Sequence, residues 1–321
     1  MGIKIIGTGS YLPPTVETAQ PPRPVGEESQ DELLALFSGA QCHRVCLEQE
    51  TATFIGMMAA RDALSNANID PKTLDAVICY TGVEDNETPK DVYGMLNGIG
   101  CDGIMAWTMD TACASFLSHL QCANALSSAG KKRILIVEAM NWVNRAFGRE
   151  KKPESPAALV GDGAGAVIVE SVAGRGSIVD VIEKTSSANF DFIRMGSAQC
   201  SGKQEFLEFT TSHKIIYRAF SILPETAQEV LARNGLNAND VKWTISHQPG
   251  LNAIERWHGM LSIPIEKNLN TFTLYGNMSA ANIPVTLNHF LTVEPKVRRG
   301  DIILAFTAGA GIHCAAMIIQ Y

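Results

Sequence analysis

Long apolar runs are missing from this 321-residue chain, and none reaches the roughly 18 to 20 residues that a membrane-spanning helix needs. An excess of positive charge is also missing, because 26 Lys and Arg stand against 33 Asp and Glu and give a net charge of -7. A nucleic-acid-binding protein needs a basic face to release counterions. We therefore expect neither a membrane protein nor a nucleic-acid partner.

The cysteines lack the density and pairing of a secreted disulfide framework. Cys42, His43 and Cys46 lie close together, but three potential ligands without zinc-knuckle spacing predict no metal site. The chain begins with a strand-like segment at 3–7 and no long apolar leader. We expect a protein of the reducing cytoplasm. The eight cysteines are Cys42, Cys46, Cys79, Cys101, Cys113, Cys122, Cys200 and Cys314.

The residues that are present describe a chain with a large core. Hydrophobic residues make up 46% of the sequence, and several apolar segments are continuous rather than alternating. Continuous apolar strands are typical of sheets covered by helices on both faces, so the sequence predicts an α/β fold. The expected strands are 1–10, 75–81 and 133–139, and the expected helices are 30–38, 51–66 and 91–99.

An internal repeat organises the whole chain. Residues 59–80 resemble residues 226–247, and the same offset of 167 residues carries Cys113 onto Ala280. A helix, a basic pair, an apolar strand, a turn and a final strand follow in both copies. The repeated order of elements indicates duplication of one α/β unit.

We divide the chain into an N-terminal half, 1–172, and a C-terminal half, 173–321. Two stacked copies would bury their strands between helical layers and bring equivalent loops together at their junction. In the second half these loops are 246–250 and 275–277, and each carries a polar residue at the transition from strand to helix. We expect a functional site at this junction.

Cys113 is the candidate nucleophile of that site. Asp110 and Thr111 are good N-cap residues, and the apolar helical period begins at Phe116. Cys113 is thus expected in the first turn of a buried helix, where the free amide groups and the helix dipole favour a thiolate. The alternative interpretation is that Cys113 is a small core residue.

The sequence resembles the β-ketoacyl-acyl carrier protein synthase III group of the thiolase superfamily over nearly its whole length. The resemblance implies a thiolase-like fold in which two duplicated α/β halves form a layered αβαβα core. Five motifs carry the resemblance in the order of that group, at 110–116, 161–167, 247–250, 276–284 and 305–310.

The resemblance also implies a mechanism. Cys113 would take an acyl group from a thioester, and the amide groups of Cys113 and Gly309 would form the oxyanion hole. His247 and Asn277 would bind the carbonyl oxygen of a malonyl-type thioester and stabilise the enolate left by loss of CO2. Acyl-CoA or carrier-protein thioesters are then substrates, and no separate cofactor is implied.

Further residues are candidates for substrate binding. Arg149 and Lys152 belong to a basic run that suits a phosphopantetheine carrier or a coenzyme A phosphate, although such a run is more commonly a solvated face. Apolar residues near the motifs are candidates for an acyl channel, although such residues are core residues by default. They are Met109, Trp142, Phe147, Met278 and Phe306.

Departures from the family pattern fall in substrate recognition. Leu33 stands where the pattern has an adenine-stacking Trp, Phe37 where it has an Arg, and Asn252 where it has a basic carrier-docking residue. These differences predict a specialised condensing enzyme rather than one that uses an acetyl-CoA primer. The alternatives are an acyltransferase that forms esters or amides without decarboxylation, and a partner subunit of an active paralogue. The resemblance further implies a homodimer.

Overall fold

The computed structural model describes residues 1–19, 39–145, 160–190, 193–197, 207–211 and 213–321. The helix expected at 30–38 lies outside these residues. Helix α2 (Ala52–Ala67) and helix α3 (Asp91–Ile99) confirm the helices expected at 51–66 and 91–99 within one residue.

The first sheet has five strands in the order β1-β7-β6-β4-β5. Strands β1 and β7 are antiparallel, as are β7 and β6, whereas β6, β4 and β5 run parallel. The three strands expected from the sequence are present as β1, β4 and β6. The five strands are β1 (Gly2–Tyr11), β4 (Ala76–Thr81), β5 (Met105–Thr108), β6 (Arg133–Met140) and β7 (Gly163–Val172).

The second sheet repeats this topology in the order β8-β13-β12-β11. Strands β8 and β13 are antiparallel, as are β13 and β12, and β12 and β11 are parallel. The strands are β8 (Ile178–Thr185), β11 (Trp243–Ser246), β12 (Ile302–Gly309) and β13 (His313–Gln320).

The duplication expected from the sequence is confirmed by this match of order and direction. It extends to the backbone of the turns that precede the two central helices. Ala112 and Ser279, which are 167 residues apart, both have positive φ angles, 52° and 50°. Such a conformation is uncommon for residues other than glycine, so its recurrence reflects a shared turn geometry.

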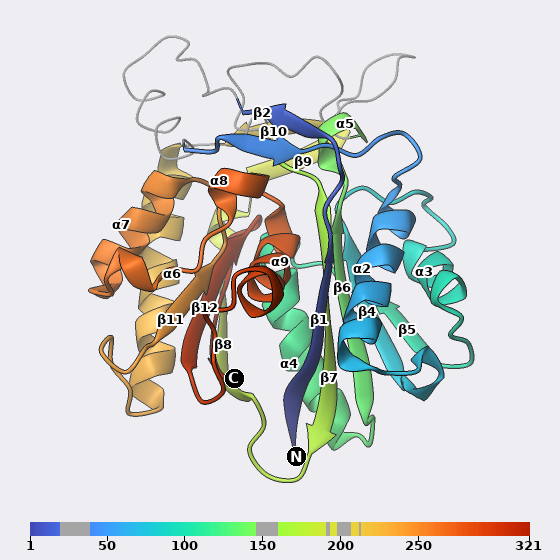
Figure 1. Cartoon of the computed structure of the whole chain (residues 1–321). Helices are drawn as coiled ribbons and strands as arrows, with labels where there is room; N and C mark the ends of the chain where they lie inside the picture. Colours follow the sequence, from blue (N-terminus) through green and yellow to red (C-terminus); the bar gives the residue numbers. More distant parts are fainter. Residues whose placement is uncertain (20–38, 146–159, 191–192, 198–206, 212) are drawn as a thin grey trace.

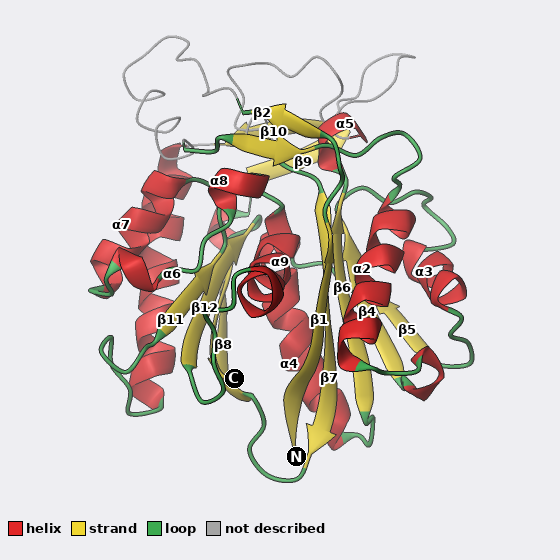
Figure 2. Ribbon diagram, viewed as in Figure 1, coloured by secondary structure: helices red, strands yellow, loops and turns green. Residues whose placement is uncertain are grey.

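The two sheets and their helices form five layers (Figure 1). Helices α2 and α3 cover the outer face of the first sheet, and α6 (His213–Arg233) and α7 (Leu251–Leu261) cover the outer face of the second. Helices α4 (Ser115–Ser128) and α9 (Asn282–Asn288) lie between the sheets, as Figure 2 also shows. This is the layered αβαβα core that the resemblance implies.

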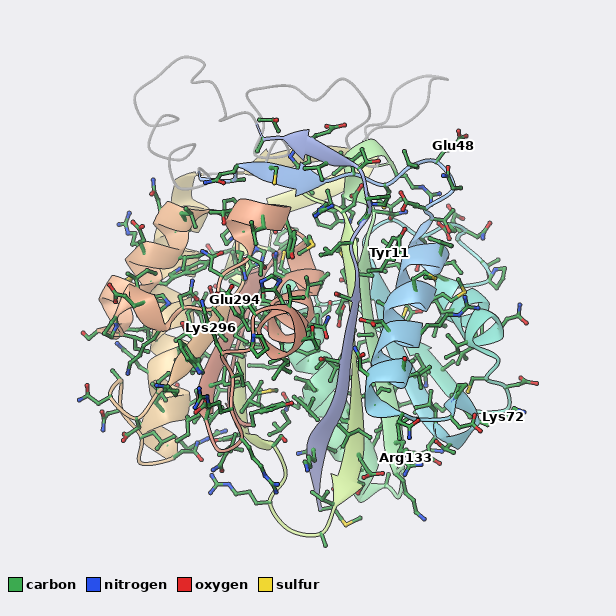
Figure 3. The ribbon with its side chains drawn as sticks, in the orientation of Figure 1. Tyr11, Glu48, Lys72, Arg133, Glu294 and Lys296 are labelled. Carbon is green, nitrogen blue, oxygen red and sulfur yellow. The ribbon has the colours of Figure 1, made fainter. Side chains whose placement is uncertain are left out.

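Strand alternation explains why the strands are continuously apolar. On β6, Ile134 and Ile136 point into the central core around α4, whereas Leu135 and Val137 point into the outer core beneath α2. Residues of both halves make up the central core. Side chains fill the space between the ribbons (Figure 3). The two halves are therefore packed as one unit.

Shorter elements gather at the end of the layers opposite the N-terminus (Figure 1). Strand β2 (Val16–Thr18) pairs with β3 (Cys42–Arg44), and β9 (Ile193–Ser197) pairs with β10 (Leu207–Thr211). The buried Asp162 carboxylate accepts hydrogen bonds from Cys46 N at 2.8 Å and from Val143 N at 2.9 Å. The glycine-rich segment at the start of β7 thus has a structural role, because its Asp162 binds two other backbone segments.

Among the residues that the structure describes, no helix is both long enough and apolar enough to cross a membrane.

The close approach of β1 to α2 can be tested by a substitution at Gly9. A Cβ atom at Gly9 would lie 2.1 Å from Ala63 N and 2.6 Å from Ala59 O, which are rigid backbone atoms. We expect Gly9→Ala to lower the free energy of unfolding by about 1–3 kcal/mol or more, the usual cost of overpacking. Chemical denaturation would measure it.

Gly259→Ala is the matched control, because nothing lies within 4 Å of a Cβ at this exposed position of α7. Removing a helical glycine there should stabilise the protein by up to about 1 kcal/mol. Equal effects of the two substitutions would contradict the close approach of β1 to α2.

Candidate active site

Cys113 lies in a short 3₁₀ turn, Ala112–Ala114, between β5 and α4. Side chains on both sides hold this turn. The Ala112 amide donates to Asp110 Oδ1 at 2.7 Å, and the Thr111 amide donates to Ser115 Oγ at 2.9 Å. The α-helix proper begins at Ser115, so Cys113 lies in the 3₁₀ turn directly before α4 rather than in its first turn, where the sequence places it.

The protonation of Cys113 differs from the expectation. Burial raises the pKa of the Cys113 thiol to about 11, although a bond from Ser279 and the Cys113 amide act to lower it. Loss of hydration disfavours the thiolate more than nearby donors favour it. The resting side chain is therefore a thiol at neutral pH, and a base is needed to ionise it.

His247 follows β11 and approaches from the second half of the chain. Its amide donates to Phe306 O at 2.9 Å, which continues the pairing of β11 with β12. Burial lowers the pKa of His247 to about 4, while the Asn282 side chain and the Ser279 backbone oppose this shift. His247 is thus a neutral imidazole at pH 7.

The next residue, Gln248, anchors the loop that carries His247. Its Nε2 donates to Thr286 Oγ1 at 2.8 Å, and its Oε1 accepts from Thr271 N at 3.0 Å. Gln248 and both threonines are buried, so these polar groups satisfy one another. The loop is therefore rigidly attached to α9 and to the segment before α8 (Phe272–Tyr275).

Asn277 lies in the turn between α8 and α9. Its Oδ1 accepts from Ser279 N at 2.9 Å, and its carbonyl oxygen accepts from Gly161 N at 2.9 Å. With the amide oxygen occupied, the Nδ2 group is the part of the side chain that remains to donate to a substrate.

Ser279 connects the three residues and was not predicted as a site residue. Its Oγ lies 3.1 Å from Cys113 Sγ, its amide bonds Asn277, and its backbone faces His247. The repeat offered a signal for it, because the offset of 167 carries Ala112, beside the nucleophile, onto Ser279. The structure therefore brings Cys113, His247 and Asn277 together around one serine.

Gly309 is in direct backbone contact with the nucleophile turn. A Cβ there would lie 2.5 Å from Thr111 O and 3.2 Å from Cys113 N, so only glycine fits. Two residues earlier on β12, Thr307 Oγ1 donates to Cys113 O at 2.8 Å. The two turns are thus held against each other across the junction of the halves.

The predicted channel residues divide into two groups. Trp142 and Met278 are buried in one apolar cluster, and Met109 packs against the central core. Phe306 lies in the outer core against Trp257, with ring centroids 6.2 Å apart. Because Thr307 faces Cys113 and strand neighbours alternate, Phe306 points to the opposite face of β12. This placement does not agree with a role for Phe306 in an acyl channel.

Arg149, Lys152 and Phe147 lie outside the described residues. The cluster of Cys42, His43 and Cys46 does not gather metal ligands, and within the described ranges no group of three or more His, Cys, Asp or Glu side chains could hold an ion. Instead, His43 faces Glu17 at 3.5 Å.

An open cavity of about 580 Å³ adjoins the nucleophile turn at Asp110. Its walls come from the ends of β4 and β5 and from α3, and they combine the charged Glu84 and Lys90 with the aromatic Tyr93 and Trp107. Cys113 is not among its lining residues. The cavity is therefore beside the nucleophile rather than around it.

Comparisons with known proteins match this fold and these residues. The family model of 3-oxoacyl-[acyl-carrier-protein] synthase III matches residues 108–187, which include Cys113. The model of the C-terminal region of the same family matches residues 231–321, which include His247, Asn277 and Gly309.

Several relatives align along the entire chain. The β-ketoacyl-[acyl-carrier-protein] synthase III of Aquifex aeolicus is 32% identical, with 100% of both chains covered. Its Rickettsia bellii counterpart is 26% identical, again with 100% of both chains covered. The crystal structure of the Aquifex aeolicus synthase III superposes with a TM-score of 0.85 at 28% identity over 100% of both chains.

More distant structures show the same fold. A priming β-ketosynthase of a polyketide biosynthetic pathway has a TM-score of 0.86 at 24% identity, over 99% of this chain and 96% of the other. OleA from Xanthomonas campestris has a TM-score of 0.85 at 17% identity, over 100% of this chain and 97% of the other.

The doubled sheet with a cysteine turn at its junction defines a condensing enzyme of the thiolase fold. The chain belongs to the β-ketoacyl-[acyl-carrier-protein] synthase III family, and its enzymatic class is that of the acyltransferases.

Ser279→Ala tests the contact with the nucleophile. The bond from Ser279 lowers the pKa of Cys113, so its removal should reduce the thiolate fraction. A hydrogen bond worth about 0.5–1.5 kcal/mol predicts that iodoacetamide alkylates Cys113 about 2- to 10-fold more slowly at pH 8.5. Peptide mass spectrometry would give the rate.

Ser127→Ala is the control, because the Ser127 hydroxyl donates to Asn124 O within α4, at 3.0 Å, away from Cys113. Its effect on the alkylation of Cys113 should be negligible. Unchanged or faster alkylation in Ser279→Ala would show that Ser279 does not stabilise the thiolate.

Proposed function

We propose that the chain loads an acyl group from a thioester onto Cys113 and then joins it to a malonyl-type thioester by decarboxylative Claisen condensation. The observation that carries this proposal is the convergence of Cys113, His247 and Asn277 around Ser279, with Gly309 against the nucleophile turn. The product is a β-ketoacyl thioester.

In the first step, Cys113 Sγ attacks the carbonyl carbon of the acyl thioester. Its proton passes to His247. This imidazole can accept a proton because burial keeps the ring neutral before the reaction. The amide groups of Cys113 and Gly309 bind the oxyanion. The bond to the donor sulfur breaks, the donor leaves as a thiol with the proton, and the acyl group stays on Cys113.

In the second step, the malonyl-type thioester places its carbonyl oxygen between His247 Nε2 and Asn277 Nδ2. Breaking of the bond to the carboxylate releases CO2 and leaves its electron pair in an enolate that these two donors stabilise. The enolate carbon attacks the acyl carbon, and the bond to Cys113 Sγ breaks. The released thiolate takes up one proton from solvent, which restores the resting enzyme.

The acyl substrate is proposed to be a specialised one. Leu33, Phe37 and Asn252 replace the residues that the family pattern uses for coenzyme A and carrier recognition. Met109, Trp142 and Met278 are the apolar residues proposed to border the acyl chain, together with Phe147. The similar proteins include β-ketoacyl-[acyl-carrier-protein] synthases and a priming β-ketosynthase of a polyketide pathway, which supports variation of substrate on this fold.

A second candidate is transfer of the acyl group to an alcohol or amine without decarboxylation. The neutral state of His247 is compatible with it, because a neutral imidazole can act as general base toward such an acceptor. Release of CO2 from a malonyl thioester distinguishes the two reactions.

The proposed assembly is a homodimer. Strand β5 is the edge of the first sheet, and Trp107 on this strand and Tyr93 on the adjacent α3 are 44% and 54% exposed. An unpaired edge with exposed aromatic side chains suits association with a second copy.

We place the enzyme in the cytoplasm, in line with the seven free cysteines of the described residues. We propose no cofactor beyond its thioester substrates.

Intact-mass spectrometry after mixing with a panel of acyl-CoA thioesters tests the nucleophile. We expect one acyl adduct, located on Cys113, that is absent in Cys113→Ala and retained in the control Cys122→Ala. Cys122 is a partly exposed cysteine of α4 outside the site. An adduct on another residue, or none with any chain length, would refute the proposal.

The condensation step is tested by CO2 release from a malonyl thioester with the acylated enzyme. Removing one donor in Asn277→Ala should lower the rate about 10²- to 10³-fold. Acyl transfer to an amine or alcohol without CO2 release would favour the second candidate.

Arg149 and Lys152 are proposed to bind the phosphates of the donor. Reversing both charges in Arg149→Glu and Lys152→Glu should raise the KM for the donor about tenfold with little change in kcat, because remote charge contributes to binding rather than to the reacting centre. Reversal of the exposed Lys72 is the control. An unchanged KM would remove this role.

A further inference from the structure

A buried ionic pair lies directly beneath the nucleophile turn and takes no part in the proposed chemistry. His119 of α4 and Glu138 of β6 are both fully buried, and His119 Nδ1 lies 2.7 Å from Glu138 Oε1. No other described residue donates a hydrogen bond to either oxygen of the Glu138 carboxylate. His119 is thus the group that can share a proton with this carboxylate within the described ranges.

The other ring nitrogen of His119 reaches the backbone of the nucleophile turn. Its Nε2 lies 2.9 Å from the carbonyl oxygen of Met109, four residues before Cys113. On its other side the Met109 amide donates to Cys79 O at 3.0 Å. Met109 is therefore held from β4 and from α4 just where the chain leaves β5 for the turn.

Both ring nitrogens of His119 face oxygen acceptors, and this fixes the number of protons that the arrangement needs. When His119 and Glu138 together carry two protons, one of them is on Nε2 and is donated to Met109 O. The other proton is shared between Nδ1 and Glu138. When the shared proton is lost, the remaining proton lies on Nδ1 and is donated to the Glu138 carboxylate. Nε2 then faces the Met109 carbonyl oxygen with a lone pair. The hold on the turn is then lost.

The surroundings favour retention of the proton. Burial lowers the pKa of His119, but Glu138 outweighs it and the net shift is upward. Burial also raises the pKa of Glu138. The charge of Asp110, in the turn, raises the pKa of both groups. The charge of Glu138 in turn raises the pKa of Cys79 and Tyr80 on β4. From the second half, Glu183 and His313 bond each other, and Glu183 also bonds Ser118.

We propose that His119 and Glu138 are a positioning pair that holds the Met109 carbonyl, and with it the Cys113 turn, for acyl transfer, and that this hold requires one shared proton. The proposal rests on the proposed function of Cys113. A buried ion pair is costly compared with apolar residues of the same size, so its placement against this turn calls for such a role.

Three variants separate positioning from packing. His119→Phe with Glu138→Leu replaces the pair by apolar side chains and removes the donor to Met109 O. Glu138→Gln keeps the shape, and its amide can donate to Nδ1 so that Nε2–H still binds Met109. His258→Phe is the matched control, because His258 is a buried histidine bonded at both nitrogens, to Thr244 Oγ1 at 3.0 Å and Ile263 O at 3.1 Å, away from the turn.

The measurements are kcat and KM for acyl loading from the acyl-CoA panel between pH 6 and 10. We expect the apolar pair to lower kcat at least about tenfold at pH 7 with KM nearly unchanged, since small misplacement of a reacting group is costly. Glu138→Gln should retain the wild-type kcat at pH 7. The kcat of Glu138→Gln divided by that of wild type should then rise with pH, because wild type loses the shared proton. His258→Phe should leave kcat within about twofold.

Three results would overturn the proposal. They are an unchanged kcat in the apolar pair, a Glu138→Gln ratio that stays flat with pH, and an equal loss in His258→Phe. If the apolar pair fails to fold, the pH ratio of Glu138→Gln decides alone.

Iodoacetamide separates failure of this inference from failure of the proposed function. If no acyl-CoA transfers its acyl group to Cys113 of wild type, the proposed function fails. The rate at which iodoacetamide alkylates Cys113 still measures how well the turn is held. A loosened turn should expose Cys113 and speed its alkylation at least about fivefold in the apolar pair, with Cys122 as internal reference. Equal rates in the apolar pair and His258→Phe would overturn the positioning role.

Discussion

The contact between two short turns, one from each half of the chain, is the constraint on which the site depends. Cys113 Sγ meets Ser279 Oγ at 3.1 Å, and Thr307 holds the Cys113 carbonyl from the second sheet. Neither half contains both sides of this contact. The shared central core around α4 and α9 keeps the halves in register, because shifting one against the other would open apolar packing on both sides.

The same burial that fixes this contact sets the resting charge of its residues. It raises the pKa of Cys113 and lowers that of His247, so both groups are neutral before substrate arrives. A preformed thiolate–imidazolium pair would have to be stabilised in a dry site, so in the proposed reaction the proton leaves Cys113 for His247 only as the thiol attacks.

The family relationship extends along the whole chain, and the residues that the site needs lie in the two matched regions. Departures from the family pattern, as at Leu33 and Asn252, fall instead at positions to which the resemblance assigns substrate recognition. This division is physically reasonable. Condensation requires one arrangement of nucleophile, donors and oxyanion hole, while the surfaces that bind the acyl chain and its carrier can change without disturbing that arrangement.

The sequence by itself determined the doubled α/β architecture, the three strands and two helices named from pattern, and the identity of the candidate nucleophile and donors. These follow from local periodicity, from the offset of 167 and from the motifs around Cys113, His247 and Asn277. Only the tertiary structure decided the role of Ser279, the side of β12 to which Phe306 points, and the protonation of Cys113. Each of these depends on which atoms of distant segments meet and on how much water they exclude, and neither quantity is encoded in the local pattern of residues.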